Sequence, residues 1–149
     1  MQVETAAKLE TVVRESRAWL LDLDEATVRL KPTADRWSIA EVVGHMVDSA
    51  SNNHHRFIRA QDLSELSFPK YDQNAWVEKN DYHSADWPGL VELWYLYNLQ
   101  LARVIQRISA EQLTTPCTIG PNEPCTLSFL VEDYLDHLEH HLQKIRERI

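Results

Sequence analysis

The chain has 149 residues, of which 44% are hydrophobic and 26% are charged, so we expect a single domain, residues 1–149, with one sizeable core. The formal net charge of −8 and the lack of any run of Lys or Arg argue against nucleic acid as a partner. No apolar run approaches the roughly 20 residues of a membrane-spanning helix, and the amino terminus lacks the pattern of a signal peptide. These features predict a cytoplasmic protein without a membrane partner.

The first half of the chain shows two long helical patterns. Apolar residues recur at helical spacing from residue 3 to about residue 23, and residues 23–36 are interpreted as a loop because Pro32 and Asp35 interrupt the pattern. Ser38 and Glu41 have the spacing of a capping box, which predicts the start of a second long helix that reaches about residue 61. Residues 62–85 are less regular, with a short helix expected around residues 74–79.

The second half contains two more long helical patterns. One starts near Asp86, where Pro88 suits a first helical turn, and runs to about residue 108. Residues 109–125 are interpreted mostly as a connection. Thr126 is a good N-cap for the last helix, which is expected to end near Arg148. Four long helices with connections of unequal length predict an all-α fold, a four-helix bundle.

The last helix contains the stretch DHLEHH, residues 136–141. His137 and His141 are four residues apart and therefore lie on one helix face, where both can reach a single metal ion. His140 is rotated by about 100° and points elsewhere. A catalytic zinc-type site takes about three protein ligands and keeps one position open, so a third ligand is needed.

His45 is the best candidate for that third ligand. It lies in the middle of a core-like helix, and a polar stripe continues from it along the same side of the helix. Unpaired buried polar groups are costly, and a metal ion shared with the last helix would satisfy all three imidazoles. We therefore predict a divalent-metal site formed by His45, His137 and His141. Zn or Ni are the first choices, and Fe or Cu also suit three imidazoles.

Other interpretations of these histidines remain open. A His pair four residues apart is also common on a solvated helix face, and a lone core histidine often only makes a hydrogen bond. A zinc finger is disfavoured because seven residues separate Cys117 from Cys125, where a finger has two to four. Both cysteines are expected to be free thiols. The pattern HExxH of metalloproteases is absent, because no Glu follows His137 directly.

Three segments resemble the DinB superfamily, in particular its YfiT-like members, which are presumed metal-dependent hydrolases. They are WSIAEVVGHMVDS (37–49), FPKYDQNAWV (68–77) and DHLEHHLQKI (136–145), and the resemblance extends from about residue 10 to residue 148. It implies a four-helix bundle whose three histidines, at the positions of His45, His137 and His141, hold a divalent metal. It also implies a homodimer, and an activity either as a hydrolase or as an S-transferase that uses a low-molecular-weight thiol.

The open metal position would take a water or a thiol, and the substrate is expected to be a small molecule. Asp48 is the candidate catalytic residue, because it could orient a ligand imidazole or move a proton. Arg56 could pair with a substrate carboxylate. The other candidate substrate-binding residues are Asn52 beside Arg56 at the mouth, and Tyr71, Asp72 and Trp76 closing over the pocket.

A non-catalytic protein is the main alternative to an enzyme. A structural zinc site is closed by four protein ligands, and Asp48 is the best candidate for a fourth. In that case the bundle would be a metal-binding structural or sensor protein. A bundle with a degenerate site and no metal is the third possibility.

Overall fold

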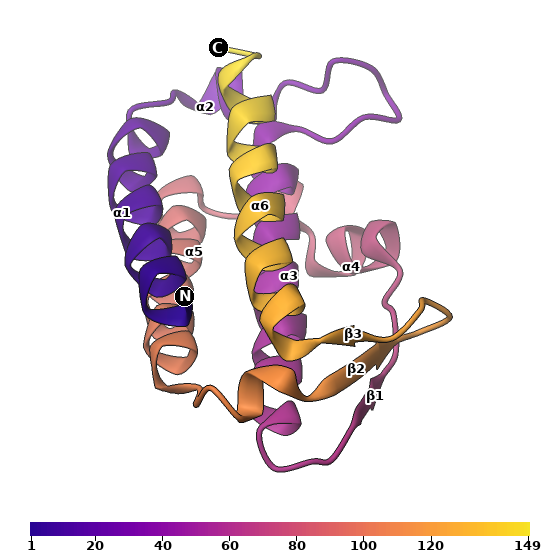
Figure 1. Ribbon diagram of the computed structural model, residues 1–149. Coiled ribbons are helices and arrows are strands. Elements are labelled where there is room, and N and C mark those ends of the chain that lie inside the picture. Colours follow the sequence, from indigo (N-terminus) through magenta and orange to yellow (C-terminus); the bar gives the residue numbers. More distant parts are fainter.

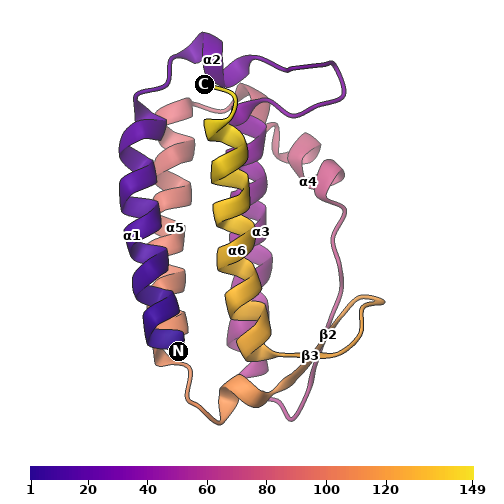
Figure 2. The ribbon, with the colours of Figure 1, turned by 45° about the horizontal axis from the view of Figure 1, so that its top comes forward.

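Four long helices form the body of the computed structural model, which describes residues 1–149. They are α1 (Gln2–Leu21), α3 (Ile39–Ala60), α5 (Trp87–Arg107) and α6 (Leu127–Arg146). Helices α1 and α3 each pack against both α5 and α6, so the order around the bundle is α1, α5, α3, α6 (Figure 1). Figure 2 shows that α3 and α5 run in the same direction. The expectation of an all-α four-helix bundle is confirmed.

Side-chain caps set the starts of three of these helices. Ser38 and Glu41 form a complete capping box at the start of α3. The Asp86 carboxylate accepts a hydrogen bond from the Gly89 N–H at the start of α5, and the Thr126 hydroxyl accepts one from the Phe129 N–H at the start of α6. These caps satisfy amide donors that a helix start leaves unpaired. The three starts agree with the sequence prediction to within one residue.

The core fills the space among the four long helices. Its largest fully buried side chains come from all four, and they include Leu9, Met46, Phe57, Trp94 and Leu138. A buried polar pair crosses this core, because the Tyr134 hydroxyl donates to Asn98 Oδ1 at 2.5 Å. Burial of such a pair is tolerated because each member supplies the hydrogen bond that the other needs.

Several short elements were not predicted from the sequence. They are α2 (Glu25–Arg29), the 3-10 helices η1 (Tyr82–Ser84) and η2 (Gln112–Thr114), and the strands β1 (Leu66–Phe68), β2 (Pro116–Ile119) and β3 (Cys125–Thr126). The predicted short helix near residue 74 is α4 (Gln73–Asn80). The interpretation of residues 23–36 as a loop was therefore wrong at α2, whose N-cap Asp24 lies directly before it.

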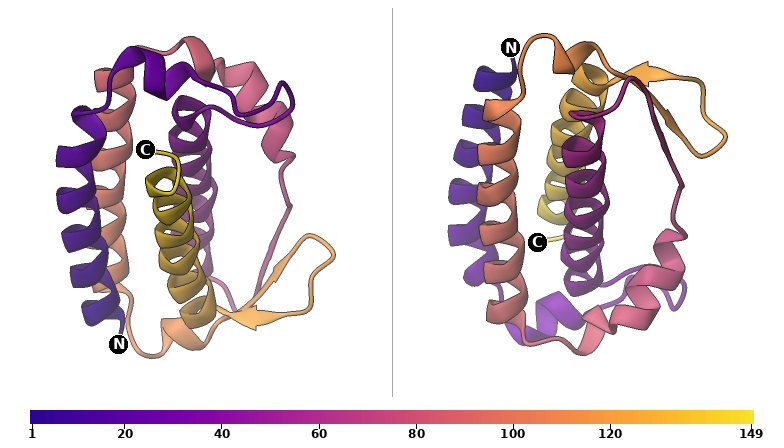
Figure 3. Two further views of the ribbon diagram at one scale, coloured as in Figure 1. Left: turned by 90° about the horizontal axis from the view of Figure 1, so that it is seen from above. Right: turned by 90° about the horizontal axis from the view of Figure 1, so that it is seen from below.

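The three strands form a small sheet on one side of the bundle. β1 pairs in parallel with β2, with Leu66 opposite Cys117, and β2 pairs antiparallel with β3, with Cys117 opposite Cys125. Figure 3 shows the sheet and α4 beside the α3–α6 pair, on the side away from α1 and α5. This placement covers one flank of α3 and α6. None of the helices is long and apolar enough to cross a membrane.

Candidate metal centre

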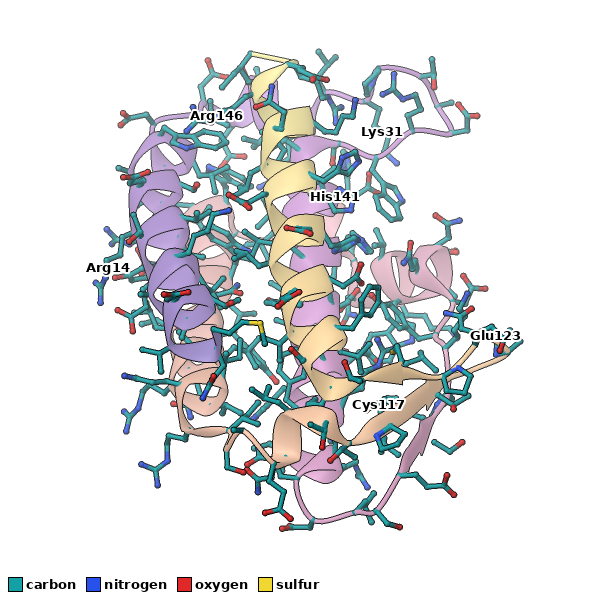
Figure 4. All side chains as sticks on the ribbon, viewed as in Figure 1. Arg14, Lys31, Cys117, Glu123, His141 and Arg146 are labelled. Carbon is teal, nitrogen blue, oxygen red and sulfur yellow. The ribbon has the colours of Figure 1, made fainter.

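Three histidines from two adjacent helices meet on this covered flank. His45 Nε2 lies 3.4 Å from His137 Nε2, and His141 Nε2 lies 3.0 Å from His137 Nε2. One ligand atom from each of the three residues lies within 4.8 Å of the other two. A tetrahedral ion with Zn–N bonds of about 2.0–2.1 Å would separate its nitrogen ligands by about 3.4 Å. The two Nε2–Nε2 distances of 3.4 Å and 3.0 Å are close to this value, so small side-chain adjustments would let the three histidines hold one ion. Figure 4 shows His141 on the flank of α6 that faces away from α1.

The electrostatics of the cluster favour neutral imidazoles. Burial, aided by the two neighbouring imidazoles, lowers the pKa of His45 to about 3. Burial likewise lowers the pKa of His141 to about 4 and lowers the pKa of His137. At neutral pH all three rings therefore offer lone pairs, which metal ligands need. Because the cluster contains no carboxylate, a bound divalent ion would keep its full double charge.

Asp48 does not orient His45 in the way the sequence suggested. Its Oδ1 accepts hydrogen bonds from the Tyr82 hydroxyl at 2.6 Å and from Asn80 Nδ2 at 3.2 Å. Its Oδ2 and His45 Nδ1 are both buried without a hydrogen-bond partner. On the other side of His45, the ring of Trp37 lies 4.9 Å away between centroids. Asp48 is therefore a buried acid fixed by Tyr82 and Asn80, with no hydrogen bond to a cluster imidazole.

A polar cavity of about 340 Å³ reaches the cluster at His137. Such a volume lies in the lower part of the range of small-molecule sites, about 300–1,000 Å³. Helices α3 and α6 form one wall, and the segment after β1 and the β2–β3 hairpin form the other. The lining residues are Ser49, Asn53, Arg56, Lys70, Tyr71, Gln73, Ile119, Asn122, Asp133, Tyr134 and His137.

Only two of the expected substrate-binding residues, Arg56 and Tyr71, line this cavity. The other three have structural contacts instead. Asn52 donates to the Asp48 carbonyl at 2.9 Å, and Asp72 caps α4 by accepting from the Ala75 N–H at 3.1 Å. Trp76 packs edge-on against the Tyr71 ring, with 5.2 Å between centroids. These three side chains are not among the residues that line the cavity, and their contact with a substrate stays a prediction.

Asp133 is the acidic residue of the cavity that the sequence placed on the polar face of His137 and His141 but that was not assigned a role in the site. Asp133 lies one helical turn before His137 in α6, and both residues line the cavity. The negative charge of Asp133 partly offsets the lowering of the His137 pKa. Its spacing of four residues from His137 was the available signal, since such residues share a helix face. Ser49 and Asn53 bring further polar groups from α3 into the cavity. The sequence analysis did not name them as lining residues either.

The remaining histidines and the cysteines lie outside the cluster. His54 Nδ1 is 2.9 Å from the Tyr97 hydroxyl, and His83 Nδ1 is 3.1 Å from Ser38 Oγ. His55 and His140 are exposed. Cys117 and Cys125 are free, and neither lines the cavity beside the cluster. No Cys₂His₂ arrangement exists.

The fold and site together describe a helical bundle with a three-histidine cluster of the metal-binding type. The profile of the DinB superfamily matches residues 8–145, and the chain belongs to this superfamily. A relative from Bacillus subtilis (strain 168), named "Putative metal-dependent hydrolase YfiT", is 24% identical over 157 aligned residues, covering 93% of this chain and 86% of the relative.

The solved structure of YfiT from Bacillus subtilis has the same fold. Its TM-score is 0.83 at 20% identity, and the match covers 99% of this chain and 83% of that one. That structure is described as a probable metal-dependent hydrolase with an unusual four-helix bundle topology.

Proposed function

We propose that this protein is a metal-dependent hydrolase of small molecules whose divalent ion is held by His45, His137 and His141. The observation that carries the proposal is the convergence of three neutral Nε2 atoms beside a polar cavity. Such an ion, when bound, supplies Lewis acidity that polarises the substrate and lowers the pKa of a water or thiol. The name of the YfiT relative supports the same class of activity.

Asp133 is the residue best placed to move protons in this site. Its carboxylate faces the cavity, one helical turn from His137. In hydrolysis, the oxygen of water bonds to the electrophilic atom of the substrate and the bond to the leaving group breaks. Asp133 accepts the proton from water and delivers it to the leaving group, which balances the reaction. We assign this part to Asp133 rather than to Asp48, because Asp48 does not line the cavity and its Oδ1 already accepts hydrogen bonds from Tyr82 and Asn80.

A thiol-dependent transferase is a second candidate for the same site. The three ligands are neutral, so the site retains a double positive charge that would stabilise a thiolate as well as a hydroxide. The two candidates differ in the attacking group, which is the thiol of a small cosubstrate in one case and water in the other. Neither cysteine of the chain replaces that thiol, because burial raises the pKa of both Cys117 and Cys125.

The test begins with the metal content of protein purified without an affinity tag or chelator. We expect about one divalent ion per chain in the wild type, none in His45→Ala, and an unchanged content in His54→Ala, which removes a histidine of the same helix from outside the cluster. Retention of the ion by His45→Ala would refute the site.

The second part of the test measures turnover. Loaded protein is assayed with p-nitrophenyl esters and small amides, and separately with a small aryl chloride plus glutathione. Asp133→Asn should keep its metal but lose about 10²–10⁴-fold in rate, the usual contribution of a general base. The neighbouring exposed residue provides the control Glu132→Gln. Turnover only in the presence of the thiol would replace the hydrolase by the transferase.

A further inference from the structure

The guanidinium group of Arg56 is buried and has no ionic partner. Arg56 is 9% exposed, and none of the ion pairs shorter than 4.0 Å includes it. Its Nε has no hydrogen-bond partner, and its Nη1 donates only to Asn53 Oδ1 at 3.5 Å, the outer limit of a hydrogen bond. Buried charges are normally paired, because an unpaired one loses its hydration without compensation.

The surroundings of Arg56, which lines the cavity, leave its donors largely without partners. The Phe68 ring lies 5.5 Å from the guanidinium carbon and provides an apolar cation–π contact, which satisfies no N–H donor. Asn53, Tyr71 and Asp133 line the same cavity as Arg56. Burial is the main influence on the pKa of Arg56 and lowers it, and the charge of Asp133 acts only in part against this. Because the ordinary pKa of arginine is far above neutral, the group remains a charged guanidinium in spite of this lowering, and its donors are largely unused.

The charges around the cavity favour an anion with one negative charge. In the metal-free protein, Arg56 and Lys70 contribute two positive charges and Asp133 one negative charge, which leaves a net charge of +1 when His137 is neutral. The stem of the exposed Lys70 lies close to the hairpin, since a Cβ built on Gly120 would be 2.8 Å from Lys70 Cγ. The planar fork of a guanidinium matches the two oxygens of a carboxylate.

We propose that the cavity recognises a carboxylate group of a small substrate, with Arg56 as its main partner and Lys70 as a second cation. In this arrangement the carboxylate anchors one end of the substrate, and the reacting bond lies toward His137. The position of the reacting end rests on the proposed function, whereas the carboxylate site does not. Arg56 is a binding residue in this proposal and takes no part in bond breaking.

Nuclear magnetic resonance tests the proposal directly, because the Nε–H of a buried arginine gives its own signal. Metal-free and zinc-loaded protein are titrated with N-acetylglycine and with its neutral primary amide. We expect the Arg56 Nε–H signal to shift with the acid and not with the amide, in both forms of the protein. Arg56→Gln should weaken binding of the acid by about 10- to 100-fold, the usual contribution of a hydrogen-bonded charge.

Matched variants separate the site from general charge effects. Arg59→Gln removes an exposed arginine three residues further along α3 and should bind the acid like the wild type. Arg56→Lys keeps the charge, should fold if Arg56→Gln does not, and should still bind several-fold more weakly than the wild type. Equal binding of acid and amide, or wild-type binding by Arg56→Lys, would overturn the proposal.

Two further outcomes distinguish the source of the anion and the status of the metal. N-acetylaminomethylphosphonate, the phosphonate counterpart of N-acetylglycine, carries up to two negative charges. If it binds ten times more tightly than N-acetylglycine, the preferred ligand of the site is a phosphate-type group and not a carboxylate. Binding of the acid at Arg56 in a protein that takes up no metal would support the carboxylate site while refuting the proposed function. Binding of the acid only in the zinc-loaded protein, without a shift of the Arg56 signal, would assign the anion to the metal and refute the site.

Discussion

The buried acid Asp48 has an unusual balance of contacts. Only one of its carboxylate oxygens is hydrogen bonded, and the side chain is 2% exposed. Burial raises the pKa of Asp48 to about 6, although the hydrogen bond from the Tyr82 hydroxyl acts in the opposite direction. Because this pKa lies above the ordinary value of 3.8, the folded protein holds a proton between about pH 4 and pH 6 that the unfolded chain releases.

Asp48→Asn should therefore raise stability in a pH-dependent way. The wild type has the full contribution of the protonated acid below about pH 4, and loses it as the pH rises through about 6. Asparagine keeps the oxygen that accepts from Tyr82 and does not ionise. In urea unfolding of metal-free protein, the variant should equal the wild type near pH 4 and exceed it by on the order of 2 kcal/mol at pH 8.

The control for this prediction is Asp62→Asn, at an exposed position just after α3. Its stability difference from the wild type should not change with pH in the same way. A difference for Asp48→Asn that is flat between pH 4 and pH 8 would contradict the raised pKa of this carboxyl.

The two acids Asp48 and Asp133 show what helix periodicity could and could not predict. Asp48 follows His45 by three residues and is offset by about 60° around α3, whereas Asp133 precedes His137 by four residues and is offset by about 40° around α6. Either offset is small enough for the acid to lie near the histidine of its own helix. The segment that packs over α3 decides the outcome, because Tyr82 and Asn80 cover Asp48. That contact joins distant parts of the chain and has no signal in local sequence.

At the scale of elements, Gly44 determines how closely η1 approaches α3. A Cβ at this position would lie 2.1 Å from ring atoms of Tyr82, far inside van der Waals contact. The absence of a side chain thus lets the Tyr82 ring lie against the helix backbone. From this position the Tyr82 hydroxyl reaches Asp48.

Gly44→Ala should destabilise the protein by about 1–3 kcal/mol, the usual cost of overpacking a buried site. In an unconstrained helix the same change would stabilise by roughly 0.5–1 kcal/mol. The sign therefore reports the clash, and urea unfolding measures it. In a Tyr82→Ala background, which removes the ring, Gly44→Ala should become neutral or stabilising. Destabilisation of equal size in both backgrounds would show that Tyr82 is not the cause.

The long helices could be predicted from sequence because they carry strong local signals, such as the Ser38–Glu41 capping box and the Thr126 cap. The sheet could not. Its strands have two to four residues, too few for a clear alternation of apolar and polar side chains. Its pairing joins Leu66 to Cys117, which lie far apart in the chain. Half of the cavity wall depends on that pairing, so most lining residues outside the long helices remained hidden.

At the scale of the whole molecule, the histidine cluster connects two helices that are distant in sequence. His45 and His137 are 92 residues apart, and they meet because α3 and α6 pack side by side. The spacing on α6 predicted one helix face, and the resemblance to the DinB superfamily pointed to the same three residues. The structure adds the side of the bundle on which they meet, where His137 lines a cavity together with Lys70 and Asn122.

An ion at this position should act as a cross-link of the folded state and raise its melting temperature. A ligand that binds only the folded protein adds about 2.7 kcal/mol at a free concentration 100 times its Kd, which corresponds to about 5–10 °C for a chain of this size. Calorimetry with zinc and with chelator should show this difference for the wild type and for His54→Ala, and none for His45→Ala. The shift should also vanish at strongly acidic pH, because protons then compete for the imidazoles, whose pKa values of about 3 for His45 and about 4 for His141 set the range. An equal zinc shift in His45→Ala would place the ion elsewhere on the bundle.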